Sequence, residues 1–172
     1  MIKRVAITGP ESTGKSDLTV RLAEHFRTVW VPEYARMYLE DLNRDYYQED
    51  ILLIAQGQKK LSEEIEPRAN RIMFSDTEML VAKIWSEFKY GSCHPWILWA
   101  LENQQFDLYL LTNIDLPWRD DPLREHPDKR EVLFHIYLKE LKNLGKPFEI
   151  ISGSGHERFN SALEAINKRL NI

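Results

Sequence analysis

The chain has 172 residues, of which 43% are hydrophobic and 29% are charged, the balance of an ordinary globular protein. Its net charge of −4 offers no basic field for nucleic acid or an anionic membrane, so we expect a small-molecule substrate and neither of those partners. The single cysteine, Cys93, cannot form an internal disulfide, and no apolar stretch has the length of a signal-peptide core or a membrane span. We therefore expect a cytoplasmic protein, and leave a homo-oligomer open.

Short apolar runs rich in β-branched residues alternate with segments of helical periodicity. In chain order we expect a strand at 4–8, a helix at 15–26, a strand at 28–31, a helix at 46–66, a strand at 71–75, helices at 79–90 and 96–105, a strand at 108–112, a helix at 130–144, a strand at 148–152 and a helix at 157–170. This alternation predicts one α/β domain over residues 1–172, a three-layer sandwich around a five-stranded parallel sheet. Residues 116–130 are polar and proline-marked, and we expect them to form a mobile lid.

The first expected strand leads into a glycine-bounded loop, Gly9–Ser16, with the sequence GPESTGKS. Its glycines allow tight turns, and its successive N–H groups, with the positive end of the following helix, form a nest for phosphate. In this pattern Lys15 reaches the β- and γ-phosphates of ATP and Ser16 ligates Mg²⁺, as in P-loop NTPases and kinases. The residues expected to bind the nucleotide are Gly9, Glu11, Ser12, Thr13, Gly14, Lys15, Ser16 and Asp17.

Asp76 follows the apolar run of the third expected strand. A carboxylate at a buried strand end beside the phosphate loop is the usual second anchor for Mg²⁺. We therefore expect Asp76 to act with Ser16 at a metal site. The alternative is that Ser75 and Asp76 only cap the helix that follows.

Glu33 and Arg36 follow the second expected strand, within the sequence VPEYAR. Acceptors of P-loop kinases lie over the carboxyl ends of the strands, where the Glu33 carboxylate would orient a hydroxyl and take its proton. Arg36, one helical turn on, would bind the substrate or steady Glu33. For Arg36 a surface ion pair of little energetic consequence is a serious alternative.

The lid carries Arg119, Arg124 and Arg130. Phosphoryl transfer spreads negative charge over the phosphoryl oxygens, and arginines on a closing loop stabilise that charge and exclude water. We expect Arg119 and Arg124 to be catalytic, ahead of Arg130. Because acidic residues are interspersed with them, a solvated, self-paired loop is the alternative. The acidic residues are Asp120, Asp121, Glu125 and Asp128.

Two other classes of P-loop protein fit the sequence less well. A GTPase needs N-K-x-D after a strand to read guanine, whereas the fourth expected strand leads into Thr112-Asn113-Ile114-Asp115, and the D-x-x-G glycine is missing after Asp76. A AAA-type motor usually shows an acidic pair where this chain has Asp76-Thr77. The motifs alone therefore indicate a P-loop kinase or NTPase.

Five segments together resemble a known family. ITGPESTGKS, VPEYAR, FSDTE, KYGSCHPW and DLPWRDDPLR, in this order, look like the ribosylnicotinamide kinase domain of the bifunctional NAD-biosynthesis and regulatory proteins. The resemblance covers nearly the whole chain. It implies ATP- and Mg²⁺-dependent phosphorylation of the ribose 5′-hydroxyl of nicotinamide riboside to nicotinamide mononucleotide. It also implies that Asp76 serves the metal or the ribose, that Glu33 is the base, and that Arg119 and Arg124 belong to the lid.

The bifunctional members of that family carry an adenylyltransferase domain, and some a DNA-binding domain, before the kinase. This sequence begins at the first strand and contains no H-x-G-H signature. We therefore expect neither adenylylation nor transcriptional regulation from it.

The sequence is rich in aromatic residues, which would suit the flat, positively charged ring of nicotinamide riboside. We expect Tyr34 and Trp118 to line the pocket, although most large aromatic side chains are core. Gln56 and Gln58 are candidates for the ribose, with exposure to solvent as the alternative. Two other functions stay open: a kinase for another nucleoside or small alcohol, and an ATP-binding switch that signals through its lid.

Overall fold

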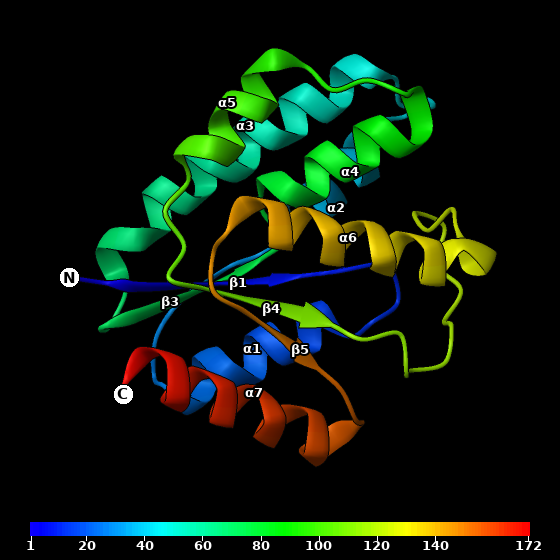
Figure 1. Ribbon diagram of the computed structural model, residues 1–172. Coiled ribbons are helices and arrows are strands. Elements are labelled where there is room, and N and C mark those ends of the chain that lie inside the picture. Colours follow the sequence, from blue (N-terminus) through cyan, green and yellow to red (C-terminus); the bar gives the residue numbers. More distant parts are fainter.

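The computed structural model describes residues 1–172 and is built around a parallel sheet with the strand order β2-β3-β1-β4-β5 (Figure 1). The strands are β1 (Lys3–Thr8), β2 (Trp30–Val31), β3 (Ile72–Asp76), β4 (Leu108–Thr112) and β5 (Phe148–Ile151). Every residue of β3 and β4 is buried, which explains their continuous apolar runs, because both faces of the sheet are covered. The predicted five-stranded parallel sheet is confirmed.

Helices cover both faces of this sheet, so the fold is a three-layer sandwich (Figure 1). One face carries α1 (Lys15–His25) and α7 (Gly155–Leu170). The other carries α2 (Tyr34–Asp41), α3 (Gln48–Ile65), α4 (Met79–Tyr90), α5 (Pro95–Asn103) and α6 (Arg130–Leu144). Two 3-10 turns lie at Glu66–Arg68 and Pro127–Lys129. No helix is both long and apolar enough to cross a membrane.

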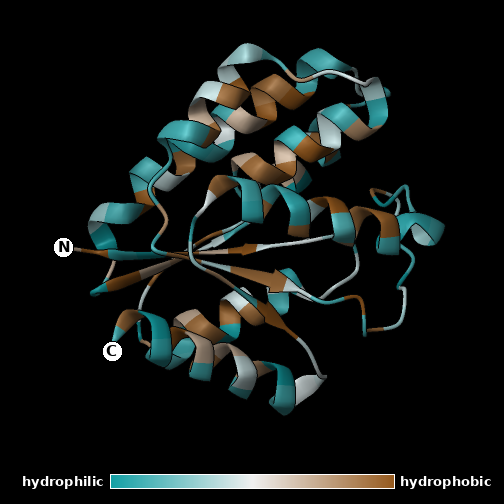
Figure 2. Ribbon diagram, viewed as in Figure 1, coloured by the Kyte–Doolittle hydropathy of each residue, from teal (hydrophilic) through white to brown (hydrophobic).

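Alternate residues of β1 and β4 point into the two larger apolar cores, while Val31 of β2 and Met73 of β3 join a third, small cluster. In β1, Val5 and Ile7 pack under α1 and α7, whereas Ala6 packs toward the helices on the opposite face. Figure 2 shows largely apolar strands between helices that carry both apolar and hydrophilic segments. The strands are therefore held from both sides, and their carboxyl ends form a rigid edge on which side chains can be placed.

Helix α2 was not predicted from the sequence. None of its residues is buried, so it lacks the apolar stripe by which a helix is recognised. It is held instead by specific contacts with α3: the Tyr34 ring lies against Gly57, and the Tyr38 hydroxyl donates to Asp50 at 2.7 Å. Strand β2 is also shorter than expected, two residues instead of four.

Candidate functional site

The phosphate loop joins β1 to α1 at the carboxyl edge of the sheet. Gly9 adopts φ +138°, and a Cβ there would lie 2.6 Å from the Thr112 hydroxyl oxygen of the neighbouring strand. Gly14 adopts φ +75° and caps α1. Both positions therefore require glycine, and the resulting turn gives the loop the curvature of an anion nest. Lys15 Nζ donates to the Pro10 carbonyl at 2.8 Å, which holds the ammonium over the loop.

Asp76 lies beside the loop because β1 and β3 are neighbours, with Ile7 and Asp76 paired in register. The Ser16 hydroxyl donates to Asp76 Oδ2, whereas the buried Oδ1 has no hydrogen-bond partner. Burial, and next the charge of Glu33, raise the pKa of Asp76 to about 6, although Lys15 and Ser16 oppose the shift. The structure thus places the two residues predicted to bind metal in direct contact.

The alternative that Asp76 only caps α4 does not fit the structure. The N-cap of α4 is Glu78, whose carboxylate accepts from the Leu80 N–H at 2.6 Å. Glu78 also accepts from Thr8 and Gln104, so its carboxylate is fully engaged inside the fold. Asp76 is left with one oxygen that no protein group uses.

Glu33 and Arg36 lie at the start of α2, after β2, which neighbours β3 and so places them on the same side of the loop as Asp76. Glu33 occupies the N-cap position, but its side chain makes no capping hydrogen bond, so its carboxylate is available to the cavity. Arg36 Nη2 pairs with Asp121 of the lid at 2.8 Å, and that hydrogen bond is the main cause that raises the pKa of Arg36. Arg36 therefore ties α2 to the lid, beyond the surface pair with Glu40 at 3.5 Å.

Gln58 fixes the segment that presents Glu33. Its side-chain oxygen accepts from the Tyr34 N–H at 2.7 Å, and its amide nitrogen donates to the Pro32 carbonyl at 3.1 Å. These two bonds hold Glu33 from both sides, and Gln58 is only 5% exposed. It is thus a support for Glu33, whereas Gln56 is exposed. A glutamine in register with Ile51, Ile54 and Ala55 on an apolar helix face was the sequence signal for this role.

The lid, residues 116–130, lies directly on the phosphate loop. Ser12 Oγ accepts from the Arg119 N–H at 2.9 Å, and the Glu11 carboxylate accepts from the Glu125 and His126 N–H groups at 3.2 and 3.1 Å. Arg130 donates to the carbonyls of Ser12 and Leu116 at 3.1 and 2.9 Å. Arg130 therefore fastens the lid.

Two of the acidic residues of the lid pair with the body of the protein. Besides the pair between Asp121 and Arg36, Glu125 pairs with Lys89 of α4 at 2.7 Å and accepts from the Tyr46 hydroxyl. Burial is the main cause that raises the pKa of Tyr46 to about 12, so it stays a donor. These contacts differ from those of a self-paired, solvated loop, because they dock the lid against α2 and α4.

A cavity of about 670 Å³ opens between the phosphate loop, α2, α4, α6 and the lid, a size typical of small-molecule sites. Its polar walls include every loop residue from Gly9 to Asp17, together with Glu33, Arg36, Arg119 and Arg124. Its apolar wall comes from α4 and α6 and consists of Val81, Ile84, Trp85, Phe88, Leu133 and Tyr137. Nearly all of the predicted site residues therefore meet around one volume.

Three predicted site residues do not line this cavity: Tyr34, Trp118 and Asp76. Asp76 lies directly behind it, in contact with the lining residue Ser16. The Tyr34 ring packs on α3, and Trp118 lies in a second, shallow hollow on the lid, with its indole N–H donating to Asp120 at 2.8 Å. The structure thus corrects the prediction for the pocket aromatics, which are Trp85, Phe88 and Tyr137. Their sequence signal was the helical spacing of Val81, Ile84, Trp85 and Phe88, which also suits a core helix.

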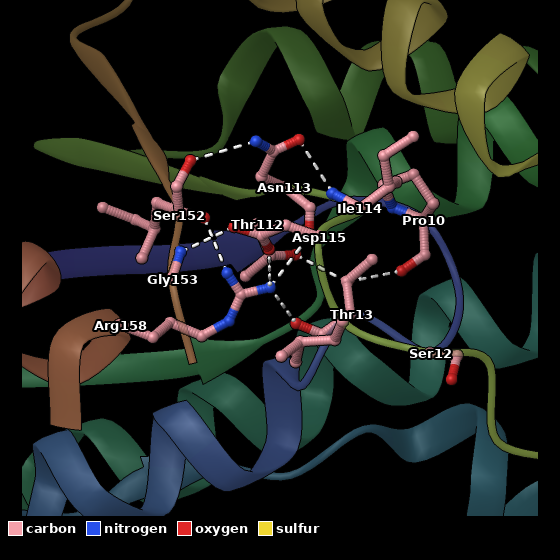
Figure 3. A network of polar contacts seen from close by, with 12 residues as sticks. Pro10, Ser12, Thr13, Thr112, Asn113, Ile114, Asp115, Ser152, Gly153 and Arg158 are labelled. Carbon is pink, nitrogen blue, oxygen red and sulfur yellow. Dashed lines mark hydrogen bonds and ion pairs between the residues drawn. The ribbon is translucent and has the colours of Figure 1, made fainter. Parts of the chain in front are cut away.

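A second group that sequence reasoning missed supports the loop from behind (Figure 3). The guanidinium of Arg158, on the first turn of α7, donates to the carbonyls of Thr13, Asn113 and Ile151 at 2.9, 2.8 and 2.8 Å. It also pairs with Asp115 at 3.1 Å. Three loops at the carboxyl edge of the sheet are therefore joined by one buried side chain.

Known proteins resemble this chain over most of its length. A family model described as an AAA domain matches residues 4–158. The chain is 31% identical, over 98% of its length, to the trifunctional NAD biosynthesis/regulator protein NadR of Salmonella typhimurium, and it spans 43% of that relative. A solved structure of NadR protein in complex with NR superposes with a TM-score of 0.86 at 22% identity, and another in complex with NAD and AMP-PNP with 0.80 at 23% identity. Each covers 99% of this chain, which in turn spans 50% of each NadR chain.

Proposed function

We propose that this chain, which belongs to the AAA domain family whose model matches residues 4–158, is a P-loop kinase. It would transfer the γ-phosphoryl group of ATP to the ribose 5′-hydroxyl of nicotinamide riboside. The product would be nicotinamide mononucleotide. The NadR relative and the NadR structure in complex with NR support this acceptor, and the structure with AMP-PNP supports ATP as the donor. The chain spans half of those proteins or less, so this proposal concerns the kinase reaction alone.

The observation that carries the proposal is the composition of the cavity. One volume joins a triphosphate loop, a carboxylate on α2, a lid with two arginines and a wall of aromatic side chains. A simple ATP switch needs the loop and the lid, but has no use for an apolar wall beside a free carboxylate. An acceptor with both a hydroxyl and a flat ring accounts for all four features.

We assign the donor phosphates to the loop and the lid. The backbone N–H groups of the loop and the start of α1 would hold the β- and γ-phosphates, with Lys15 turning from the Pro10 carbonyl toward them. Arg119 and Arg124 reach the cavity from the lid and would carry positive charge to the transferring group. Lid contacts with Glu11 and Ser12 keep these arginines over the loop and exclude water.

Ser16 and Asp76 fit a magnesium site in chemistry and in placement. A serine hydroxyl and a carboxylate are oxygen ligands of the kind Mg²⁺ prefers, and Asp76 Oδ1 is buried without a partner. Because magnesium in kinases uses few protein ligands and completes its shell with phosphate oxygens and water, two residues suffice. A magnesium ion held there would neutralise charge between the β- and γ-phosphates.

The Glu33 carboxylate is assigned the role of general base. It would orient the 5′-hydroxyl and accept its proton as that oxygen forms a bond to the γ-phosphorus. The bond from the γ-phosphorus to the bridging oxygen breaks, and ADP leaves with the electron pair. Gln58 and the lid pair of Arg36 keep α2 in place during this step.

A substrate panel tests the proposal. ATP consumption should rise with nicotinamide riboside and stay at background with deoxynucleosides and simple alcohols. A rise with deoxynucleosides instead would identify another nucleoside kinase, and ATP binding without any active acceptor would identify a switch. Removal of Mg²⁺ by a chelator should abolish turnover.

The Glu33→Gln variant tests the base. Loss of a general base lowers the rate by on the order of 10²–10⁴-fold, so kcat should fall at least 100-fold while AMP-PNP still binds. Asp41→Asn, an exposed carboxylate at the end of the same helix, is the matched control and should leave kcat unchanged. Near-normal turnover of Glu33→Gln would remove Glu33 from the mechanism.

A further inference from the structure

Arg158 is the most heavily engaged side chain behind the phosphate loop. It is only 4% exposed and lies outside the cavity, so it cannot touch the nucleotide directly. It nevertheless donates to the carbonyl of Thr13, the loop residue before Gly14, although the two residues are 145 positions apart in the sequence. A buried arginine whose hydrogen bonds go to backbone carbonyls acts on the shape of the backbone.

The orientation of the Thr13–Gly14 peptide is not fixed by residue 14 itself. Gly14 has φ +75° and no Cβ, so no side chain at this position restricts which way the peptide plane faces. In a trans peptide the C=O and the following N–H point in opposite directions. When the Thr13 carbonyl points outward to Arg158, the Gly14 N–H must point inward, toward the position of the phosphates.

Neighbouring groups hold the Arg158 contacts in place, although its Nε has no hydrogen-bond partner (Figure 3). Asp115 pairs with Arg158 through one oxygen and accepts the Gly153 N–H with the other at 2.6 Å. Thr13 is held from the opposite direction, because its hydroxyl donates to the Pro10 carbonyl and lies 2.7 Å from the Thr112 hydroxyl. Both terminal nitrogens of the guanidinium are therefore held by partners that are themselves fixed.

We propose that Arg158 is a positioning residue that locks the Thr13–Gly14 peptide with its N–H toward the donor phosphates, and so sets the affinity for ATP. The proposal rests on the proposed function only in that the loop binds the phosphates of a nucleotide. It assigns no role to the acceptor, so a wrong acceptor would leave it intact. The expected signature is a loss of phosphate binding that spares adenosine and the acceptor.

Arg158→Lys is the main test, because lysine keeps the charge but cannot span three carbonyls in fixed directions. Binding is measured without acceptor, using Mg²⁺–AMP-PNP, Mg²⁺–tripolyphosphate and adenosine as probes. Loss of one hydrogen bond to a charged group predicts about a 10- to 100-fold weaker Kd for both phosphate probes, with adenosine unchanged within about twofold. In turnover assays the KM for ATP should rise while the KM of the acceptor stays.

Two further variants separate positioning from folding. Arg169→Lys lies on the same helix and pairs with Glu149 at the surface, so it should change no affinity. In Arg158→Ala, millimolar guanidinium should restore tripolyphosphate binding, whereas ammonium should not. If Arg158→Lys binds tripolyphosphate normally, or if it loses adenosine, acceptor and phosphate affinity in parallel with a lower Tm, the role is structural and the proposal is wrong. Arg158→Lys decides the question even where Arg158→Ala does not fold.

Discussion

Gly57→Ala offers a sharp test of how the acceptor side of the cavity is built. A Cβ at position 57 would lie 2.1, 2.4 and 2.5 Å from three atoms of the Tyr34 ring. Carbon atoms in contact lie about 3.5–4.0 Å apart, so the ring would have to withdraw by roughly 1.5 Å. Tyr34 follows Glu33 directly, and its N–H is bonded to Gln58, so this displacement would be transmitted to the proposed base.

Stability and activity should respond to this change very differently. Overpacking costs about 1–3 kcal/mol, but alanine in place of a helical glycine returns about 1 kcal/mol, so we expect a net loss near 1 kcal/mol. For a chain of this size that lowers Tm by about 2–4 °C. A misplacement of about 1 Å at a catalytic group costs on the order of 100-fold in rate. The kcat should therefore fall far more than the folded fraction.

The assay compares kcat, measured well below Tm, with thermal melting of the same protein. Gln56→Ala, at the exposed neighbouring position, is the control and should change neither quantity. The Tyr34→Ala/Gly57→Ala double variant removes the clash, and the two changes should couple by about 1 kcal/mol or more in a double-mutant cycle. A Gly57→Ala protein with a raised Tm and an unchanged kcat would refute this account of the packing.

Three further predictions concern the proposed metal ligand Asp76, the cavity residue Trp85 and the single thiol. Asp76→Asn removes a buried charge with an unpartnered oxygen, so in EDTA the free energy of unfolding should rise by about 1–3 kcal/mol. Turnover with Mg²⁺ should be lost in the same variant. A Tm in EDTA below that of the unsubstituted protein would contradict this prediction. Trp85→Ala should raise the KM of the acceptor about tenfold and leave the KM for ATP unchanged. Trp99 is exposed outside the cavity, so Trp99→Ala should change neither KM. Equal effects of the two substitutions would speak against a binding site for the acceptor ring at Trp85. Burial raises the pKa of Cys93 from 9.0 to about 11, so its alkylation at pH 8 should be about 100-fold slower than that of an unperturbed thiol. The rate should rise about tenfold per pH unit. A fast reaction at pH 8 would show that the pKa of Cys93 is not raised.

The parts of the molecule that were predictable are those with a local pattern. The loop depends on two glycines, a lysine and a serine at fixed spacing after an apolar strand, and each of these requirements is visible in sequence. The sheet was predictable because its strands are buried on both faces and therefore read as short continuous apolar runs. Asp76 could be placed because strand ends of a parallel sheet meet at one edge, as the register of Ile7 and Asp76 confirms.

The remaining parts could not be found, because their contacts are long-range or their patterns are ambiguous. Arg158 and Gln58 act on backbone carbonyls far away in sequence, and such contacts leave no periodic trace. Helix α2 has no buried residues, so its sequence lacks the apolar periodicity that predicts a helix. For the aromatic residues the spacing of Trp85 was compatible with both core and cavity, and no pattern in the sequence showed that the Tyr34 ring packs on α3.

The exposure of α2 bears on how this fold can change its substrate. The helix carries Glu33 and Arg36 into the cavity, yet none of its residues belongs to either apolar core. Most large losses of stability arise from core residues, so replacements on α2 should be tolerated by the fold. The phosphate loop, by contrast, joins a buried strand to α1 at the edge of the sheet, so fewer of its residues can be replaced without loss of the fold. Divergence toward new acceptors, in nature or in a directed-evolution library, would therefore be expected to accumulate first on α2.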